Sequence, residues 1–159
     1  MTDRRGWAAD AGGWARFRRM QVSLVLTGAL VYAGGLAERV RLNRGLTPND
    51  VVRLLAIPAA CLALTVAAVL LVPPLRRMIR GHLLASHRTG FGQSVISVVV
   101  GLGVIIAAGA FLIWRVQAAA RGGPDAAGAF SGFAAGLGLL LAQAVLARDL
   151  AREGGRNQG

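Results

Sequence analysis

Residues 54–75 read LLAIPAACLALTVAAVLLVPPL, and this stretch decides the fold class. It holds 22 residues and no charged side chain. An α-helix rises about 1.5 Å per residue, so roughly 20 apolar residues cross the hydrocarbon core of a bilayer. Because the apolar run is continuous, it predicts a membrane-spanning helix. A strand of a membrane barrel would instead alternate over about 10 residues.

Three further stretches are equally long and uncharged, and they cover residues 20–37, 91–114 and 126–147. Together the four spans hold more than half of the 159 residues. The sequence therefore predicts an all-α polytopic membrane protein with a four-transmembrane-helix bundle over residues 20–147. A basic N-terminal segment (1–19) and a basic tail (148–159) flank it.

The first span has an alternative interpretation as a cleavable secretory signal. Arg18 and Arg19 precede its apolar run, which ends in Gly35-Leu36-Ala37, a pattern of small residues that a signal peptidase accepts. Three more spans follow, and this favours an ordinary first span that is retained.

Charge predicts the orientation of the spans. All 18 basic residues are Arg, and with 7 acids they give a net charge of +11. Two-thirds of them lie in the N-terminal segment, the second connection and the tail. Cytoplasmic segments of membrane proteins carry an excess of basic residues, so these three segments are expected on the cytoplasmic side. We therefore expect a multi-pass protein of the cell membrane, in a bacterial inner membrane, with both termini cytoplasmic. The first connection departs from the pattern, since it holds as many Arg residues as the second.

The second connection, residues 74–88, reads PLRRMIRGHLLASHR. On a helix its apolar residues share one face and its basic residues the other, with Leu84 as the exception. We expect either an interfacial helix whose Arg residues bind anionic lipid headgroups or a solvated loop that only fixes orientation. The candidate lipid-headgroup ligands here and before the first span are Arg18, Arg19, Arg76, Arg77, Arg80 and Arg88.

Small residues mark candidate packing faces. In lipid, helices associate by close packing of small side chains rather than by the hydrophobic effect. Gly128, Gly132 and Gly136 recur at four-residue spacing in the fourth span, and Gly103 with Ala107 forms a weaker pair in the third. These faces predict packing either inside the chain's own bundle or with a partner, which would be a second copy or a larger membrane complex.

The chain also shows weak internal similarity. A shift of 76 residues aligns residues 21–83 with 97–159, with 13 identities in 63 positions. This alignment suggests a parallel duplication of a two-helix unit, in which each pair returns to the same side of the membrane.

Local signals predict where the second and fourth helices begin and end. Thr47-Pro48-Asn49-Asp50 is typical of a capped helix start, and Gly123-Pro124-Asp125 repeats it before the fourth span. Pro58 removes a backbone hydrogen bond and predicts a kink, and Pro73-Pro74 predicts the end of the second helix.

Aromatic residues lie at the ends of the spans. Trp7, Trp14 and Phe17 precede the first span, and Trp114 ends the third. Amphipathic rings prefer the headgroup level, so we expect all four to act as interfacial anchors.

Residues suited to catalysis or metal binding are sparse. The spans contain no ionisable residue apart from one tyrosine and one cysteine, and Cys61 is the single cysteine. His82 and His87 are five residues apart, which places them on different faces of a helix, and no carboxylate lies between residues 51 and 124. We therefore assign no catalytic, cofactor-binding or metal-binding residue and expect no cofactor.

Nucleic-acid binding is excluded as the use of the positive charge, because the Arg residues are divided among membrane flanks and no soluble domain accompanies them. These features favour a non-enzymatic structural or accessory membrane component that acts through helix packing and anionic lipid.

Two alternatives remain. One is a small-solute transporter or channel built from the two-helix unit, in which Thr27, Thr65, Ser97 and Gln143 would meet in one cavity. The other is a small membrane enzyme at the inner face that holds a phosphate or carboxylate with the Arg residues of the second connection.

Overall fold

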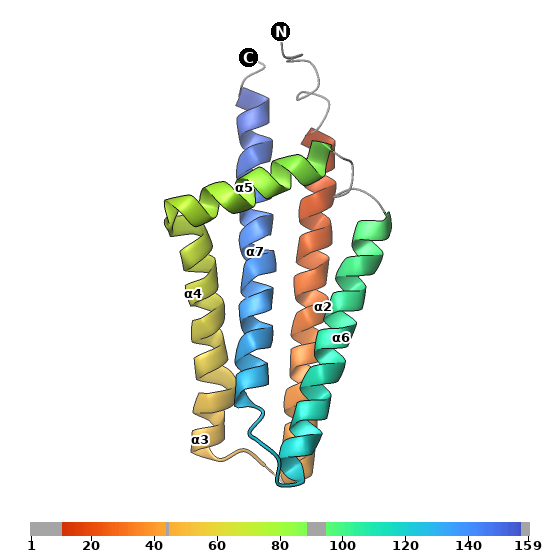
Figure 1. The fold of residues 1–159 in the computed structure, drawn as a ribbon, viewed down its shortest axis with the longest axis vertical. Coiled ribbons are helices and arrows are strands. Elements are labelled where there is room, and N and C mark those ends of the chain that lie inside the picture. The colour runs from red at the N-terminus through yellow and green to blue at the C-terminus, as the bar shows by residue number, and fades with distance from the viewer. Residues whose placement is uncertain (1–10, 44, 89–94, 157–159) are drawn as a thin grey trace.

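The computed structural model describes residues 11–43, 45–88 and 95–156, and over these ranges the regular structure is helical throughout (Figure 1). The chain order is α2 (Ala11–Asn43), α3 (Pro48–Val51), a π-helical turn η1 (Val52–Ala56), α4 (Ile57–Leu71), α5 (Pro73–Arg88), α6 (Val95–Ala120) and α7 (Ala127–Arg156). Because α3, η1 and α4 follow one another without a break, they form one helix.

Four of these helices are long and apolar enough to cross a membrane, which confirms the all-α class and the prediction of four helices of spanning length. They are Gly13–Asn43, Pro48–Leu71, Val99–Ala120 and Ala127–Glu153. The fifth helix, α5, crosses one end of the bundle. We call this the α5 end, and we call the opposite end the Thr47 end.

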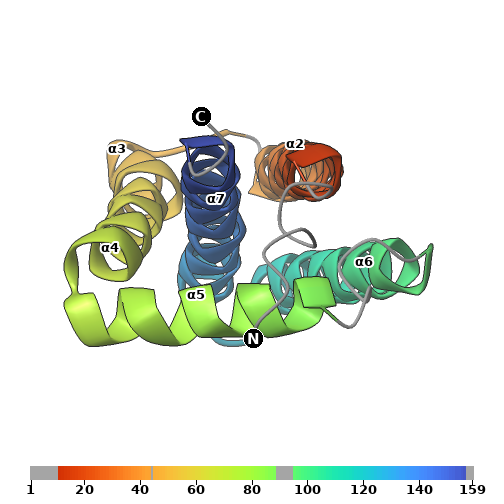
Figure 2. The same cartoon turned by 90° about the horizontal axis from the view of Figure 1, so that it is seen from above.

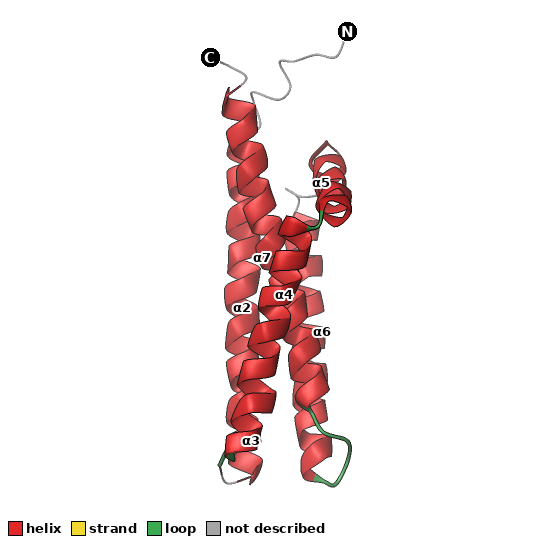
Figure 3. Cartoon of the chain, turned by 90° about the vertical axis from the view of Figure 1, so that its left-hand side faces the viewer, coloured by secondary structure: helices red, strands yellow, loops and turns green. Residues whose placement is uncertain are grey.

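Helix α7 is the central element of the bundle. It packs against α4 on one side and α2 on the other, and α6 packs mainly on α2 (Figure 2). In its apolar window 39% of residues are buried, against 17–22% in the other spans. The four spans thus form a curved row in the order α4, α7, α2, α6, with an open side between α4 and α6. Figure 3 shows α2 and α7 extending past α5 at the α5 end.

The chain's own close packing uses glycines outside the candidate faces. At Gly138 a Cβ would lie 2.7 Å from the carbonyl oxygen of Leu62, so α4 and α7 touch backbone to backbone there. On α6, Gly101 and Gly109 face the side chains of Leu24 and Val31 from α2. Each of these contacts needs a residue without a side chain on one of the two helices.

A side chain of another helix compensates for the missing amide hydrogen of Pro58. In a regular helix the amide of residue 58 donates to the carbonyl of Leu54, but proline has no amide hydrogen. The hydroxyl of Tyr32, on α2, donates to that carbonyl instead. The π-helical turn η1 ends at Ala56, two residues before Pro58. At the site of the predicted kink the structure therefore has a π-helical turn, and a side chain of another helix supplies the missing hydrogen bond.

The predicted helix ends are confirmed. The Thr47 hydroxyl accepts from the Asp50 amide at 3.2 Å, and the Asp50 carboxylate accepts from the Thr47 amide at 3.1 Å, which is a capping box. Before α7, the Asp125 carboxylate accepts from the Ala127 amide at 3.3 Å. Helix α4 ends at Leu71, one residue before the two prolines.

The halves related by the 76-residue shift differ in form. Arg76 and Arg80 lie on the transverse helix α5, whereas the aligned Arg152 and Arg156 lie on α7, which continues straight. The prolines that turn the chain aside in the first half have no counterpart in the second, where Asp149 aligns with Pro73. The duplication itself stays a prediction.

The close approach at Gly138 gives a first prediction. Replacing Gly138 by Ala places a methyl group against the Leu62 carbonyl, so we expect the free energy of unfolding to fall by about 1–3 kcal/mol. Gly132→Ala is the matched control on the same helix, because no described atom lies within 4 Å of its Cβ position. Thermal unfolding of both variants in mild detergent, followed by circular dichroism, measures the difference. Equal melting temperatures would contradict the packing at Gly138.

The bond from Tyr32 gives a second prediction. Tyr32→Phe keeps the ring contact with Phe130, whose centroid lies 5.1 Å away, and removes only the hydroxyl. We expect a loss of about 0.5–1.5 kcal/mol. In a Pro58→Ala background the loss becomes smaller, because the amide restored at position 58 donates to the same carbonyl. A double-mutant cycle measures this coupling, and additive effects would show that the two positions are independent.

Candidate functional site

Helix α5 is docked on the protein by its apolar face. Ile79 and Leu83 are 7% and 3% exposed and belong to a core cluster with residues of α2, α4 and α7. Leu84, the exception to the amphipathic pattern, packs against the same cluster. The second connection is therefore a helix and not an irregular loop, and its buried residues contact the chain itself.

Two of the expected interfacial anchors prove to be core residues. Trp14 and Phe17 are 4% and 7% exposed, and their rings meet edge to face with centroids 6.1 Å apart. The expectation of interfacial anchoring is wrong for these two, because the core cluster in which they lie also takes in α5. Trp114, at the Thr47 end, is 58% exposed, as an anchor requires. Trp7 lies outside the described residues.

Ion pairs connect α5 to the end of α7. The guanidinium of Arg76 lies 3.7 Å from the Asp149 carboxylate, and Arg80 pairs with Glu153. The sequence pattern predicts lipid contacts for both Arg residues and does not reveal these partners. The signal in the sequence is a shared spacing of four residues, between Arg76 and Arg80 on α5 and between Asp149 and Glu153 on α7. Residues four apart lie on the same face of a helix, so two such pairs can face each other.

A cavity of about 750 Å³ lies beneath α5, between α4 and α7. Most of its lining is apolar. Its polar residues are Thr65, whose hydroxyl donates to the Cys61 carbonyl at 2.8 Å, together with His82 and Gln143. Gln143 accepts a 3.3 Å hydrogen bond from the buried Gln21 of α2.

The polar residues weighed for a transporter do not all reach this cavity. Thr65 and Gln143 line it, whereas the Thr27 hydroxyl donates to the Ser23 carbonyl of its own helix at 2.9 Å. The side chain of Ser97 lies outside those described. Within the described chain, no three His, Cys, Asp or Glu side chains gather where they could hold a metal ion.

No other described helix packs closely on the candidate glycine face of α7. No described atom lies within 4 Å of a Cβ placed at Gly128, Gly132 or Gly136, and Gly136 also lines the cavity. The same is true of Gly103 on α6, and Ala107 is exposed. The close contacts of α7 with α4 and α2 lie on its other faces, and whether the glycine face packs inside the bundle or with a partner stays a prediction.

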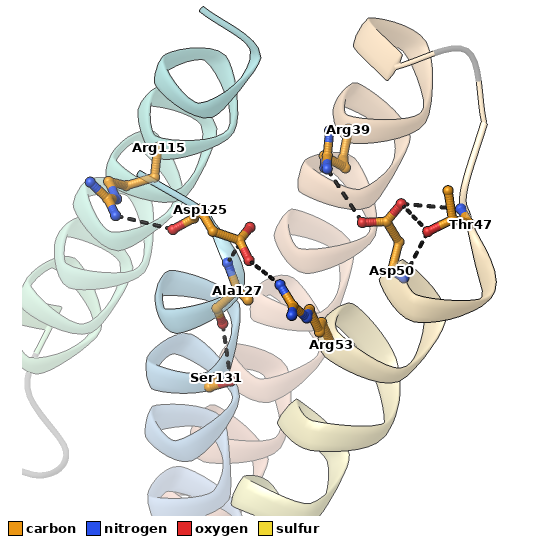
Figure 4. Close-up of polar contacts among 8 residues, drawn as sticks. All are labelled: Arg39, Thr47, Asp50, Arg53, Arg115, Asp125, Ala127 and Ser131. Atoms are coloured by element: carbon orange, nitrogen blue, oxygen red, sulfur yellow. Dashed lines mark hydrogen bonds and ion pairs between the residues drawn. The ribbon is translucent and has the colours of Figure 1, made fainter. Parts of the chain in front are cut away.

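The Thr47 end holds a network of paired charges (Figure 4). Arg39 lies 3.3 Å from the Asp50 carboxylate, and Arg53 lies 3.5 Å from that of Asp125. Arg115 donates to the Asp125 carbonyl at 3.1 Å. Glu38 accepts two hydrogen bonds of 2.7 and 2.8 Å from Arg41, and it also accepts one from Gln117.

The α5 end has fewer acids for its Arg residues. Its described carboxylates, Asp149 and Glu153, are the ones paired with Arg76 and Arg80. Among described residues no carboxylate pairs with Arg18, Arg19, Arg77, Arg148 or Arg152. The side chains of Arg88 and His87 lie outside those described. Of the candidate lipid ligands, Arg18, Arg19 and Arg77 are thus exposed without an acidic partner, which leaves them available to an external anion.

No protein-family model, curated protein or solved structure matches this chain.

The two kinds of contact that hold α5 can be ranked by magnitude. Leu83→Ala removes a buried side chain, so we expect it to lower the free energy of opening α5 by about 2–5 kcal/mol. Arg80→Ala breaks a partly exposed ion pair and is expected to cost less than about 1 kcal/mol. Hydrogen exchange of the amides of residues 75–88 reports this local opening. A larger effect from Arg80→Ala would show that charge, and not apolar burial, docks the helix.

Proposed function

We propose that this chain is a non-enzymatic accessory or assembly component of a membrane. It acts by binding a transmembrane helix on the outward glycine face of α7 and by contacting anionic lipid at its α5 end. The observation that carries the proposal is the bare face itself, since α7 is the most buried span and yet leaves Gly128, Gly132 and Gly136 uncovered.

Glycine at these positions gives the isolated chain no packing advantage. A glycine inside a helix costs about 1 kcal/mol relative to Ala, and here no described neighbour needs the space. Three glycines in line let a second helix approach α7 closely, which is how membrane helices associate when the hydrophobic effect is absent. A second copy of this chain or a subunit of a larger complex would supply that helix.

The distribution of ion pairs supports the proposed orientation. The first connection, whose Arg residues made the sequence count ambiguous, has Arg39, Arg41 and Arg53 paired with carboxylates at the Thr47 end. Among described residues, Arg115 and Arg121 at this end have no carboxylate partner, whereas the α5 end has five such residues: Arg18, Arg19, Arg77, Arg148 and Arg152. We place that end, with both termini, on the cytoplasmic side, where anionic lipids attract basic residues.

The alternatives receive less support. A transporter built from a repeated two-helix unit would bring its polar residues together, yet Thr27 bonds within its own helix. An inner-face enzyme would hold its substrate with the Arg residues of the second connection, and two of them, Arg76 and Arg80, already pair with carboxylates of the chain, which leaves Arg77.

Gly132→Leu tests the assembly. A leucine there separates α7 from any helix that packs on it, so we expect the assembled species in mild detergent to disappear. Gly34→Leu is the matched control, because Gly34 also faces outward with no described atom within 4 Å of its Cβ position but lies on α2. Size-exclusion chromatography with light scattering measures both variants. An unchanged assembly in Gly132→Leu, or a wild-type chain that purifies alone as a monomer, would refute the proposal.

A further inference from the structure

We propose that an anionic phospholipid binds between α2 and α7 at the α5 end, with its phosphate held by Arg18 and Arg148. This inference names the site of the lipid contact in the proposed function and rests on it. Each Arg directly follows a buried residue, since Phe17 and Ala147 are 7% and 0% exposed and share one core cluster. The two Arg residues themselves are exposed.

A hydrogen bond fixes how α2 and α7 face each other at this level. The side-chain amide of Gln21 donates to the side-chain oxygen of Gln143 at 3.3 Å. Phe17 lies one turn before Gln21, and Ala147 lies one turn after Gln143. The start of α2 and the end of α7 both lie at the α5 end, so the two helices are antiparallel (Figure 1). Phe17 and Ala147 therefore lie at one level on the facing sides of the pair.

The next residue along each helix turns to the same side of this pair. One residue of an α-helix turns by about 100°, and the sense of that turn, seen from one end, reverses when the chain direction reverses. Because the two helices also face each other from opposite directions, both steps lead to the same side. Arg18 and Arg148 thus flank the contact between α2 and α7. Arg152, one turn after Arg148, extends the same side outward.

The acids of this end are turned away from the two Arg residues. Asp149 follows Arg148 directly and lies 3.7 Å from Arg76 of α5, and Glu153 also pairs with α5. The side of α7 that meets α5 is therefore about 100° from the side that carries Arg148. Among described residues no carboxylate pairs with Arg18 or Arg148, so both charges are available to an external anion.

The depth of the site indicates a lipid rather than an acidic protein. Helix α5 is basic and amphipathic and crosses one end of the spans, which is where an interfacial helix lies at the level of the headgroups (Figure 3). The ion pair between Arg76 and Asp149 places Arg148 at that same level. Two guanidinium groups from neighbouring spans can both donate to the oxygens of one phosphate. Basic sites between membrane helices are typical of binding sites for anionic headgroups.

Native mass spectrometry of the full chain in mild detergent tests the site. Phosphatidylglycerol, phosphatidylcholine and inorganic phosphate are added separately. We expect the wild-type chain to bind phosphatidylglycerol more tightly than phosphatidylcholine and to form no stable adduct with inorganic phosphate. Arg18→Gln and Arg148→Gln are each expected to lower the preference for phosphatidylglycerol about fivefold, the factor for one Arg contact near an anionic surface.

Arg19→Gln is the matched control. Arg19 is exposed and pairs with no described carboxylate, as is true of Arg18, but its position is turned about 100° further from α7. We expect this variant to keep the wild-type preference, although it loses the same charge at the same depth. Equal losses in Arg18→Gln and Arg19→Gln would overturn the site, because they would show a general attraction of the basic end for anionic lipid. A stable adduct with inorganic phosphate would overturn the lipid as the ligand.

The outcomes separate this site from the proposed function. Equal losses in the two α2 variants contradict the site and leave the lipid contact at the α5 end intact. Equal binding of the two lipids by the wild-type chain contradicts that contact, and the site with it. The same spectra report the oligomeric state, and an assembly that Gly132→Leu leaves unchanged contradicts only the helix-binding role of α7.

Discussion

Every backbone polar group within a bilayer must find its partner inside the protein, and this constraint governs the structure. It explains why the spans are helices, and it explains the contact between Tyr32 and Leu54. Pro58 frees a carbonyl that water would satisfy in a soluble protein. Here the hydroxyl of a neighbouring helix takes the place of water. The consequence is that a proline in one span fixes the position of a tyrosine in another, and so helps to set how α2 and α4 face each other across α7.

The same environment removes the hydrophobic effect as a force between spans, so contacts depend on shape. Gly138 lets α4 and α7 touch backbone to backbone, and the other face of α7 is left bare at three glycines. At the α5 end a soluble-like core returns, because Trp14, Phe17 and the apolar face of α5 bury one another. Charge follows the same division, with acids and Arg residues paired at the Thr47 end and an excess of Arg at the α5 end.

Much of the fold could be predicted from sequence because membrane spans are set by local composition. The uncharged runs gave the four helices, Thr47 and Asp50 gave a helix start, and the two prolines after Val72 gave a helix end. The candidate site was predicted only in part. Arg77 and Gly136 were named, but the cavity, the ion pairs of Arg76 and Arg80, and the burial of Trp14 depend on contacts between residues more than 60 positions apart.

The sequence by itself determined that the chain is helical, that four of its segments are long and apolar enough to cross a membrane, and that a basic amphipathic segment follows the second of them. These properties depend on how favourably a segment moves from water into lipid. That free energy is set by the residues of the segment itself and by the charges next to it in sequence. Only the tertiary structure decided which glycines touch and which stay bare, and that α5 covers a cavity rather than lying free on the surface. A helix has several faces that the sequence pattern allows to pack, and the choice among them depends on which neighbours fit.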